Sequence, residues 1–219
     1  MHMSNAFAET DVARLHGLIR TYPLGALVAL TSTGLDADHI PFLIHPDPPP
    51  FGTLHGHVAR ANPVWRDTPA DAGALVIFQG DDRYISPSWY PSKQETQKVV
   101  PTWNYVVVHA HGPVRFVEDP AWILTHLEAL TREHESSRDA PWSVNDAPAA
   151  YVDAMIRKVV GIEMPIARLS GKWKVSQNRS ARDRQGVVEG LTREGTPAAM
   201  AMAELVRRTL DRGTTDKND

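Results

Sequence analysis

The stretch GALVALT at residues 25–31 is a short apolar run that is typical of a β-strand. Four further runs share its length, its apolar character and its boundaries of Gly, Pro, Asp or Ser: residues 39–44 (HIPFLI), 53–58 (TLHGHV), 74–78 (ALVIF) and 105–111 (YVVVHAH), the last extending to Val117. Turns and loops, rather than helices, separate most of these segments. We therefore expect a β-rich α+β fold that is built on an antiparallel meander or barrel.

Peripheral helices are expected where an N-cap residue precedes an amphipathic segment. Asn62-Pro63 and Asp119-Pro120 each combine an N-cap residue with Pro at the first helical position. Helices are expected at five places: from residue 10 or 11 to 22, from Asn62 onward, from Asp119 to about Glu135, over 147–159 and over 196–212. Residues 161–169 return to the alternation of a strand.

Length and composition limit the classes of protein to consider. The 219 residues fit one domain, with a C-terminal helical extension at about residues 180–212. A formal net charge of −3 excludes a general attraction to nucleic acid or anionic lipid, although not a local basic patch. The absence of cysteine excludes disulfides, a thiolate nucleophile and iron–sulfur clusters. The first ten residues lack the pattern of a secretion signal, so we expect a cytoplasmic protein.

Two His-x-His pairs, His55/His57 and His109/His111, suggest metal binding, because residues two apart on a strand point to the same face. No carboxylate follows His57 before Asp67, so the third ligand of a cupin-like site is missing. We therefore expect these histidines to form hydrogen bonds, and we expect no metal site.

The segment 55–63 (HGHVARANP) joins the end of a strand to the start of a helix. Backbone N–H groups at a helix N-terminus can bind phosphate, and Arg60 could add a bidentate cation. An ordinary capped helix with a solvated arginine explains the same residues. The sequence leaves both interpretations open.

Two loop-like segments, residues 84–90 (YISPSWY) and 101–105 (PTWNY), contain large aromatic side chains. Such residues either close the end of a sheet or form the wall of a pocket for a flat ligand. Thr102 and Asn104 lie among them and could bond to the polar edge of a heterocycle. Both interpretations stay open here as well.

Residues 170–180 (SGKWKVSQNRS) are polar and basic, without an acidic residue. The two lysines and Arg179 could bind an anion, and Gln177 and Asn178 could bond to an amide or carbonyl edge. The alternative is a solvated basic surface. No glycine-rich Rossmann, P-loop or nucleophile-elbow motif is present, so those three kinds of chemistry are not expected.

Taken together, several of these segments resemble the PaiB-type proteins, a family described as FMN-binding negative transcriptional regulators. The resemblance lies in residues 39–43 (HIPFL), 54–63 (LHGHVARANP), 84–90 (YISPSWY), 100–105 (VPTWNY), 108–112 (VHAHG) and 174–180 (KVSQNRS). Their order and spacing extend from about Phe7 to the C-terminal helix, so the resemblance covers nearly the whole chain.

The resemblance implies an FMN-binding split barrel, usually a homodimer, which holds the flavin in clefts at the subunit interface. The implied cofactor-binding residues at the isoalloxazine ring are Ile40, Pro41 and Phe42, and those at the phosphate are Arg60, Ala61 and Asn62, with His57 nearby. Thr102, Trp103 and Asn104 are implied at the ring or the ribityl chain. Lys172, Gln177 and Asn178 would close the site, either from the same subunit or from the partner subunit.

Three functions follow as alternatives. The first is an FMN-binding regulator of transcription, with DNA as a partner by resemblance alone. The second is an oxidoreductase in which the flavin takes a hydride from NAD(P)H and the protein, through His57 and Lys172, tunes its electrostatics. The third is a split-barrel protein that binds and degrades haem, for which ten histidines are available. The catalytic residues stay unassigned.

Overall fold

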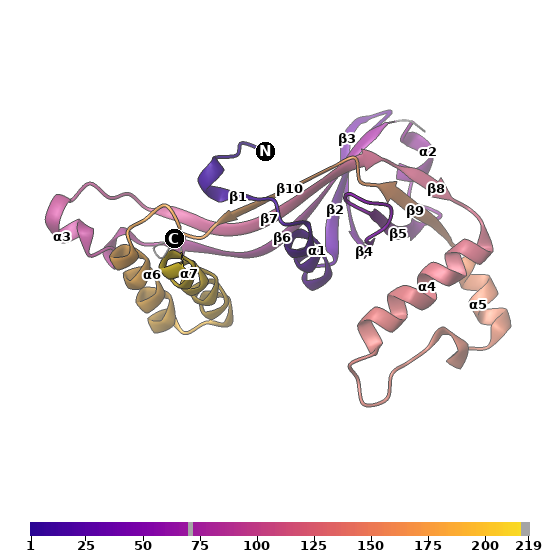
Figure 1. Ribbon diagram of the computed structural model, residues 1–219. Helices are drawn as coiled ribbons and strands as arrows, with labels where there is room; N and C mark the ends of the chain where they lie inside the picture. Colours follow the sequence, from indigo (N-terminus) through magenta and orange to yellow (C-terminus); the bar gives the residue numbers. More distant parts are fainter. Residues whose placement is uncertain (70–71, 216–219) are drawn as a thin grey trace. The chain divides into compact units, whose positions relative to one another are not determined.

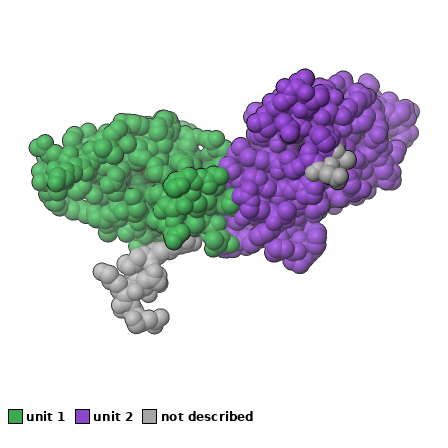
Figure 2. Space-filling model, turned by 90° about the horizontal axis from the view of Figure 1, so that it is seen from above, with its two compact units in different colours: residues 1–10, 79–107, 170–219 green, residues 11–78, 108–169 purple. Residues whose placement is uncertain are grey.

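The computed structural model describes residues 1–69 and 72–215. The chain forms two compact units, each assembled from separate segments (Figure 2). Unit 1 consists of Met1–Thr10, Gln79–Val107 and Ser170–Asp219, and unit 2 of Asp11–Phe78 and Val108–Leu169. The segments of the two units alternate along the chain, and the single-domain organisation expected from the sequence stays a prediction.

Unit 2 holds most of the helices and strands that the structure describes, and Figure 1 labels them along the chain. Its elements are α1 (Val12–Thr21), β2 (Leu24–Thr31), β3 (Gly34–Pro41), β4 (Leu43–His45), β5 (Thr53–Ala59), α2 (Val64–Asp67), β8 (Arg115–Val117), α4 (Pro120–Glu135), η3 (Val144–Asp146), α5 (Ala149–Ile156) and β9 (Val159–Pro165), together with parts of β6 (Gly73–Ile85) and β7 (Thr102–Pro113).

The strands of unit 2 pair antiparallel, as the sequence predicts. β2 forms a hairpin with β3, in which Leu30 lies opposite Leu35, and β2 also pairs with β6. A separate four-stranded sheet has the order β4-β5-β9-β8. The apolar residues of these strands and of α1 supply much of the buried core, including Leu27, Leu54 and Ile162.

The prediction of one strand over residues 39–44 is wrong, because the chain breaks at Phe42 into β3 and β4, which belong to different sheets. The Phe42 N–H donates to the carbonyl of Pro23 (2.9 Å) instead of to a neighbouring strand. Its ring is 1% exposed and meets Phe78 edge-on at 6.0 Å between centroids. Gly56 makes room for the ring, since a Cβ there would lie 2.9 Å from it.

Unit 1 contains the sheet segment β1-β10-β7-β6, formed by β1 (Ala8–Glu9), most of β10 (Arg168–Lys174) and the remaining parts of β6 and β7. Its helices are η1 (Asn5–Phe7), η2 (Pro87–Trp89), α3 (Ser92–Thr96), α6 (Ala181–Glu194) and α7 (Pro197–Thr215). Trp89 packs on α6 where Gly190 leaves space, because a Cβ at that position would lie 2.3 Å from the indole.

Local signals placed several helices correctly. The carboxylates of Asp11 and Asp119 accept hydrogen bonds from the N–H groups two residues later and begin α1 and α4. Other expectations were wrong in extent: the helix after Asn62 is the single turn α2, and residues 161–169 divide between β9 and β10. In the described part of the chain, no helix combines the length and the apolarity required to cross a bilayer.

Candidate functional site

The thirteen residues expected at a flavin site fall into two groups, one in each unit. Unit 2 holds Ile40, Pro41, Phe42, His57, Arg60, Ala61 and Asn62; unit 1 holds Thr102, Trp103, Asn104, Lys172, Gln177 and Asn178. We describe each group separately.

The side chains of Ile40 and Phe42 are part of the unit 2 core, with exposures of 3% and 1%. They are buried among other apolar residues, so neither is available to a flat ligand. Pro41 between them is partly exposed. A ligand at this point would contact Pro41 and the backbone rather than the two larger side chains.

Arg60 is bonded within its own unit. Its Nε donates to the carbonyl of Arg157 (2.9 Å), and its terminal nitrogens donate to the carboxylate of Glu118 (2.5 Å) and the carbonyl of Val159 (3.3 Å). The guanidinium also lies 5.6 Å from the ring centroid of Trp65. Its charge is therefore balanced by Glu118, and its donors fix the turn after β5 to the segment before β9.

Asn62 has a similar internal role. Its side-chain amide donates to Asp38 (2.9 Å), and its side-chain oxygen accepts from the N–H of Val64 (2.9 Å). That contact caps α2, which has only four residues, while Ala61 stays exposed. A single helical turn that is already capped has few free N–H groups for phosphate.

His57 belongs to a cluster of aromatic residues that the sequence did not reveal as a group. Its Nδ1 lies 3.1 Å from Nε2 of His126 on α4. Trp122 stacks on His126 at 5.5 Å, and His55 lies 5.0 Å from Trp122 and 4.1 Å from His45, measured between ring centroids. We call His45, His55, His57 and His126 the histidine array.

Burial keeps the histidine array uncharged. It lowers the pKa of His45 and of His57. Burial, as the largest cause, and the neighbouring histidines together lower the pKa of His55 to about 4 and that of His126 to about 3. Within this array, Nδ1 of His126 is buried without a partner. An unpaired buried N–H costs about 1–3 kcal/mol, so we assign the proton of His126 to Nε2, which donates to His57.

No group of three potential metal ligands is present among the residues that the structure describes. His109 and His111 lie on β7 with ring centroids 6.3 Å apart and are not part of the histidine array. The two His-x-His pairs therefore do not converge on one site.

The unit 1 group lies where β7 and β10 run side by side. Lys174 donates to the hydroxyl of Thr102 and to the carbonyl of Trp103 (2.7 Å). The indole of Trp103 is 55% exposed and meets Tyr84 edge-on at 6.1 Å between centroids. An exposed aromatic surface thus lies next to a cation.

Asn104 is 1% exposed and forms two hydrogen bonds with the hydroxyl of Ser176, at 2.9 Å and 3.2 Å. Both atoms of its amide are therefore in use. Asn104 therefore joins β7 to the turn after β10 rather than offering a free amide edge to a ligand.

Lys172 is 9% exposed, donates to the carbonyl of His2 (3.1 Å) and lies 5.4 Å from the ring centroid of Tyr105. The amide of Gln177 bonds back to its own chain, accepting from the N–H of Val175 (2.8 Å) and donating to the carbonyl of Trp173. Asn178 is exposed in the turn that follows β10. Of this group, Lys172 is a buried cation whose partners are neutral, whereas Gln177 shapes the turn.

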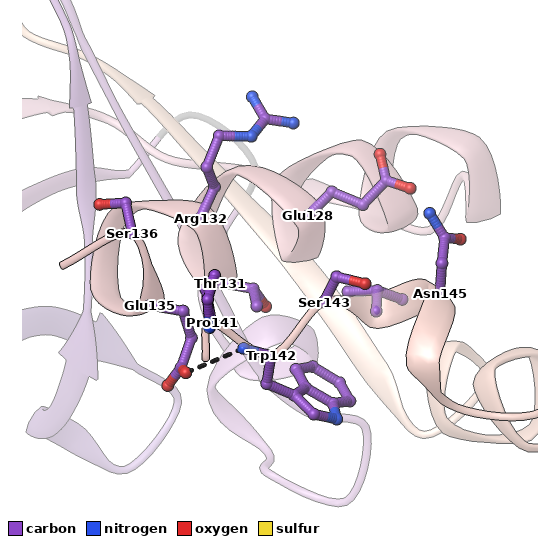
Figure 3. Close-up of a pocket in the computed structure, with 10 residues that line it drawn as sticks. Glu128, Thr131, Arg132, Glu135, Ser136, Pro141, Trp142, Ser143 and Asn145 are labelled. Carbon is purple, nitrogen blue, oxygen red and sulfur yellow. Dashed lines mark hydrogen bonds between the residues drawn. The ribbon is translucent and has the colours of Figure 1, made fainter. Parts of the chain in front are cut away.

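A cavity of about 500 Å³ lies elsewhere, between α4 and residues 136–145 in unit 2. Figure 3 shows Glu128, Arg132 and Trp142 along it, with the carboxylate of Glu135 accepting from the N–H of Trp142 (3.2 Å). None of the residues that line it belongs to the thirteen expected at a flavin site. No motif in the sequence indicates this cavity.

Comparison with known proteins identifies the family. Residues 1–168 match the family described as "Putative FMN-binding domain". An uncharacterized protein of Aspergillus fumigatus is 33% identical over 258 residues, which cover 96% of this chain and 98% of the relative. The "Protease synthase and sporulation protein PAI 2" of Bacillus subtilis is 29% identical over 210 residues, covering 96% of this chain and 98% of the relative.

Solved structures show the fold. The FAD and haem binding protein of Mycobacterium smegmatis has a TM-score of 0.56 at 19% identity, covering 76% of this chain and 73% of that chain. The flavocytochrome Anf3 of Azotobacter vinelandii has a TM-score of 0.55 at 14% identity, covering 78% of this chain and 72% of that chain. FMN is the cofactor for which the family is described. The chain therefore belongs to the PaiB-type FMN-binding family and has its split-barrel fold.

Proposed function

We propose that this protein binds FMN and that unit 1 supplies Lys172, Lys174, Thr102 and Trp103 to the cofactor. FMN needs a receptor for its phosphate, an apolar surface for its ring and polar groups beside the ribityl chain. Unit 1 offers two lysines, an indole that is 55% exposed and the Thr102 hydroxyl on adjacent strands. These residues fit the group.

One observation carries this proposal. In the described residues, neither Lys172 nor Lys174 forms an ion pair with a carboxylate, although Lys172 is almost fully buried. A buried cation without a counter-charge is unfavourable unless a ligand supplies one. When bound, the flavin would supply hydride or electron chemistry at its ring.

The absorption spectrum of the purified protein tests the proposal. Flavin bands, retained after gel filtration or restored by incubation with FMN, are expected. A Soret band instead would indicate haem. A protein that stays colourless after incubation with excess FMN would contradict FMN binding.

We further propose that the protein is a homodimer. Three leucines of the β2–β3 hairpin, Leu24, Leu30 and Leu35, are 60%, 53% and 79% exposed, and β3 is an edge strand. Exposed apolar side chains and an edge strand each favour association. Leu35→Glu should shift the sedimentation coefficient from dimer to monomer, whereas a monomeric wild-type protein would contradict the proposal.

The role that we propose for the flavoprotein is regulation of transcription. The name of the Bacillus subtilis relative, which refers to protease synthesis and sporulation, supports a regulatory role. Binding to a promoter duplex should be specific and should weaken with salt. If no duplex binds and NADH or NADPH bleaches the flavin anaerobically, the oxidoreductase alternative replaces this proposal.

A further inference from the structure

We propose that the phosphate of FMN is received by the lysine pair Lys172 and Lys174 of β10, and not by the Arg60 turn. The inference rests on the proposed FMN binding and deepens it by assigning the anion-binding residues. Two observations lead to it. The polar and charged side chains of the Arg60 turn already have partners within the protein, including carboxylates, whereas the lysine pair has no negatively charged partner among the described residues.

At the Arg60 turn, phosphate would have to replace existing partners. Arg60 bonds to Glu118 and to two backbone carbonyls, and Asn62 bonds to Asp38 and caps α2. Two carboxylates, Glu118 and Asp38, therefore lie within hydrogen-bond distance of the groups that would hold the phosphate. A dianion there would meet their repulsion.

The lysine pair has the opposite electrostatics. Lys172 and Lys174 are two residues apart on β10, so their side chains share one face of the strand. Their partners are neutral: carbonyl groups, the Thr102 hydroxyl and the face of Tyr105. Among the described residues, neither lysine forms an ion pair with a carboxylate, so the pair places two positive charges on one face of β10 without a counter-charge.

Other charged groups near the pair add to this imbalance. Burial lowers the pKa of Lys174, and the charges of Lys172 and Arg179 lower it further. Arg179 lies over the ring of Tyr90, 4.9 Å from its centroid. The buried carboxylate of Asp183 accepts from the N–H and the hydroxyl of Ser92 (3.1 Å and 2.9 Å) and forms no ion pair with another residue that the structure describes. A dianion would relieve the repulsion among the three cations.

Comparison of FMN with riboflavin isolates the contribution of the phosphate. The dissociation constants of both are measured by flavin fluorescence for the wild type, Lys174→Met, Lys172→Met and the exposed control Lys93→Met on α3. Wild type and control should prefer FMN, and each lysine variant should lose about tenfold of that preference, with riboflavin affinity unchanged. Lys174→Arg should restore most of it.

Because Lys172 is buried, Lys172→Met is interpreted only if its circular dichroism spectrum is native. If that variant does not fold, the result for Lys174→Met decides, because Lys174 is only partly buried. A wild type that binds FMN and riboflavin equally would overturn this inference alone. So would an FMN preference that Arg60→Met abolishes and both lysine variants retain. A wild type that binds neither flavin would overturn the proposed function itself.

Discussion

Nδ1 of His57 and Nε2 of His126 lie 3.1 Å apart, joining strand β5 to helix α4 by a hydrogen bond between two imidazoles. The bond needs a lone pair on one ring and an N–H on the other, so at most one of the two rings can be a cation while the bond persists. The other groups facing it are His45, His55 and the pair Glu163–Arg115. This hydrogen bond between β5 and α4 therefore requires that at least the accepting imidazole is neutral.

Acid should destabilise the protein before the carboxylates titrate. The array has pKa values below 6.5 when folded, reaching about 4 for His55 and about 3 for His126. The unfolded chain then binds more protons, so the free energy of unfolding falls as pH drops from about 6.5 towards 4. With about 1.4 kcal/mol for each unit of pKa difference, the loss amounts to about 3 kcal/mol or more. Urea unfolding at several pH values measures it.

The matched control for this pH dependence is on the same helix. His126→Gln should flatten the pH profile, because it removes the group with the lowest pKa. His134→Gln, at the exposed end of α4, should leave the profile unchanged. Equal slopes for the wild type and His126→Gln would show that the array does not control acid stability.

Gly161→Ala should destabilise unit 2. A Cβ at residue 161 would lie 2.3 Å from the ring of Trp122, so either the indole or the strand must move. Overpacking of this kind costs about 1–3 kcal/mol. Gly17→Ala is the contrasting variant, because a Cβ there meets nothing within 4 Å and helix α1 should gain up to about 1 kcal/mol. Thermal unfolding should move in opposite directions for the two substitutions.

The contributions of Asn104 and Ser176 to the free energy of unfolding should be coupled. Their side chains share two hydrogen bonds and are 1% and 3% exposed. Asn104→Ala leaves the Ser176 hydroxyl buried and unsatisfied, at a cost of about 1–3 kcal/mol. In the Asn104→Ala background, Ser176→Ala should lower the free energy of unfolding much less than it does in the wild type. A double-mutant cycle with additive free energies of unfolding would contradict this coupling.

Arg60→Met should destabilise the protein more than Glu118→Gln does. The ion pair between them is 56% exposed on the Glu118 side, so it is worth less than about 1 kcal/mol. The guanidinium also bonds to the carbonyls of Arg157 and Val159, which Glu118→Gln leaves intact. We expect Arg60→Met to cost about 1–3 kcal/mol in urea unfolding. Equal effects would assign the stabilisation to the ion pair.

Residues close in sequence made much of the fold predictable. Asp11 and Asp119 could be recognised as caps because their partners are two residues away. The break at Phe42 could not, because it depends on the Pro23 carbonyl and the ring of Phe78. An apolar run such as HIPFLI has the same pattern whether it forms one strand or two.

The candidate site was harder to predict, because the partners of its residues are also distant in the sequence. The basic character of Arg60 was evident, but its neutralisation by Glu118, 58 residues later, was not. Likewise, His57 could be singled out by its His-x-His motif, while its partner His126 lies 69 residues away on another element. The lysines of β10 were recognisable as basic, yet the proposal that they bind an anion depends on their neutral surroundings, which only the structure shows.

The interleaved course of the chain limits how the protein can be dissected. β6 and β7 each pass from one unit into the other, so no single cleavage would release either unit as a continuous fragment. A truncation after residue 168, where the family match ends, would remove the strand that pairs with β1 and both cationic side chains beside Thr102 and Tyr105. Expression trials and limited proteolysis should therefore keep the segments of both units, including β10, on one polypeptide.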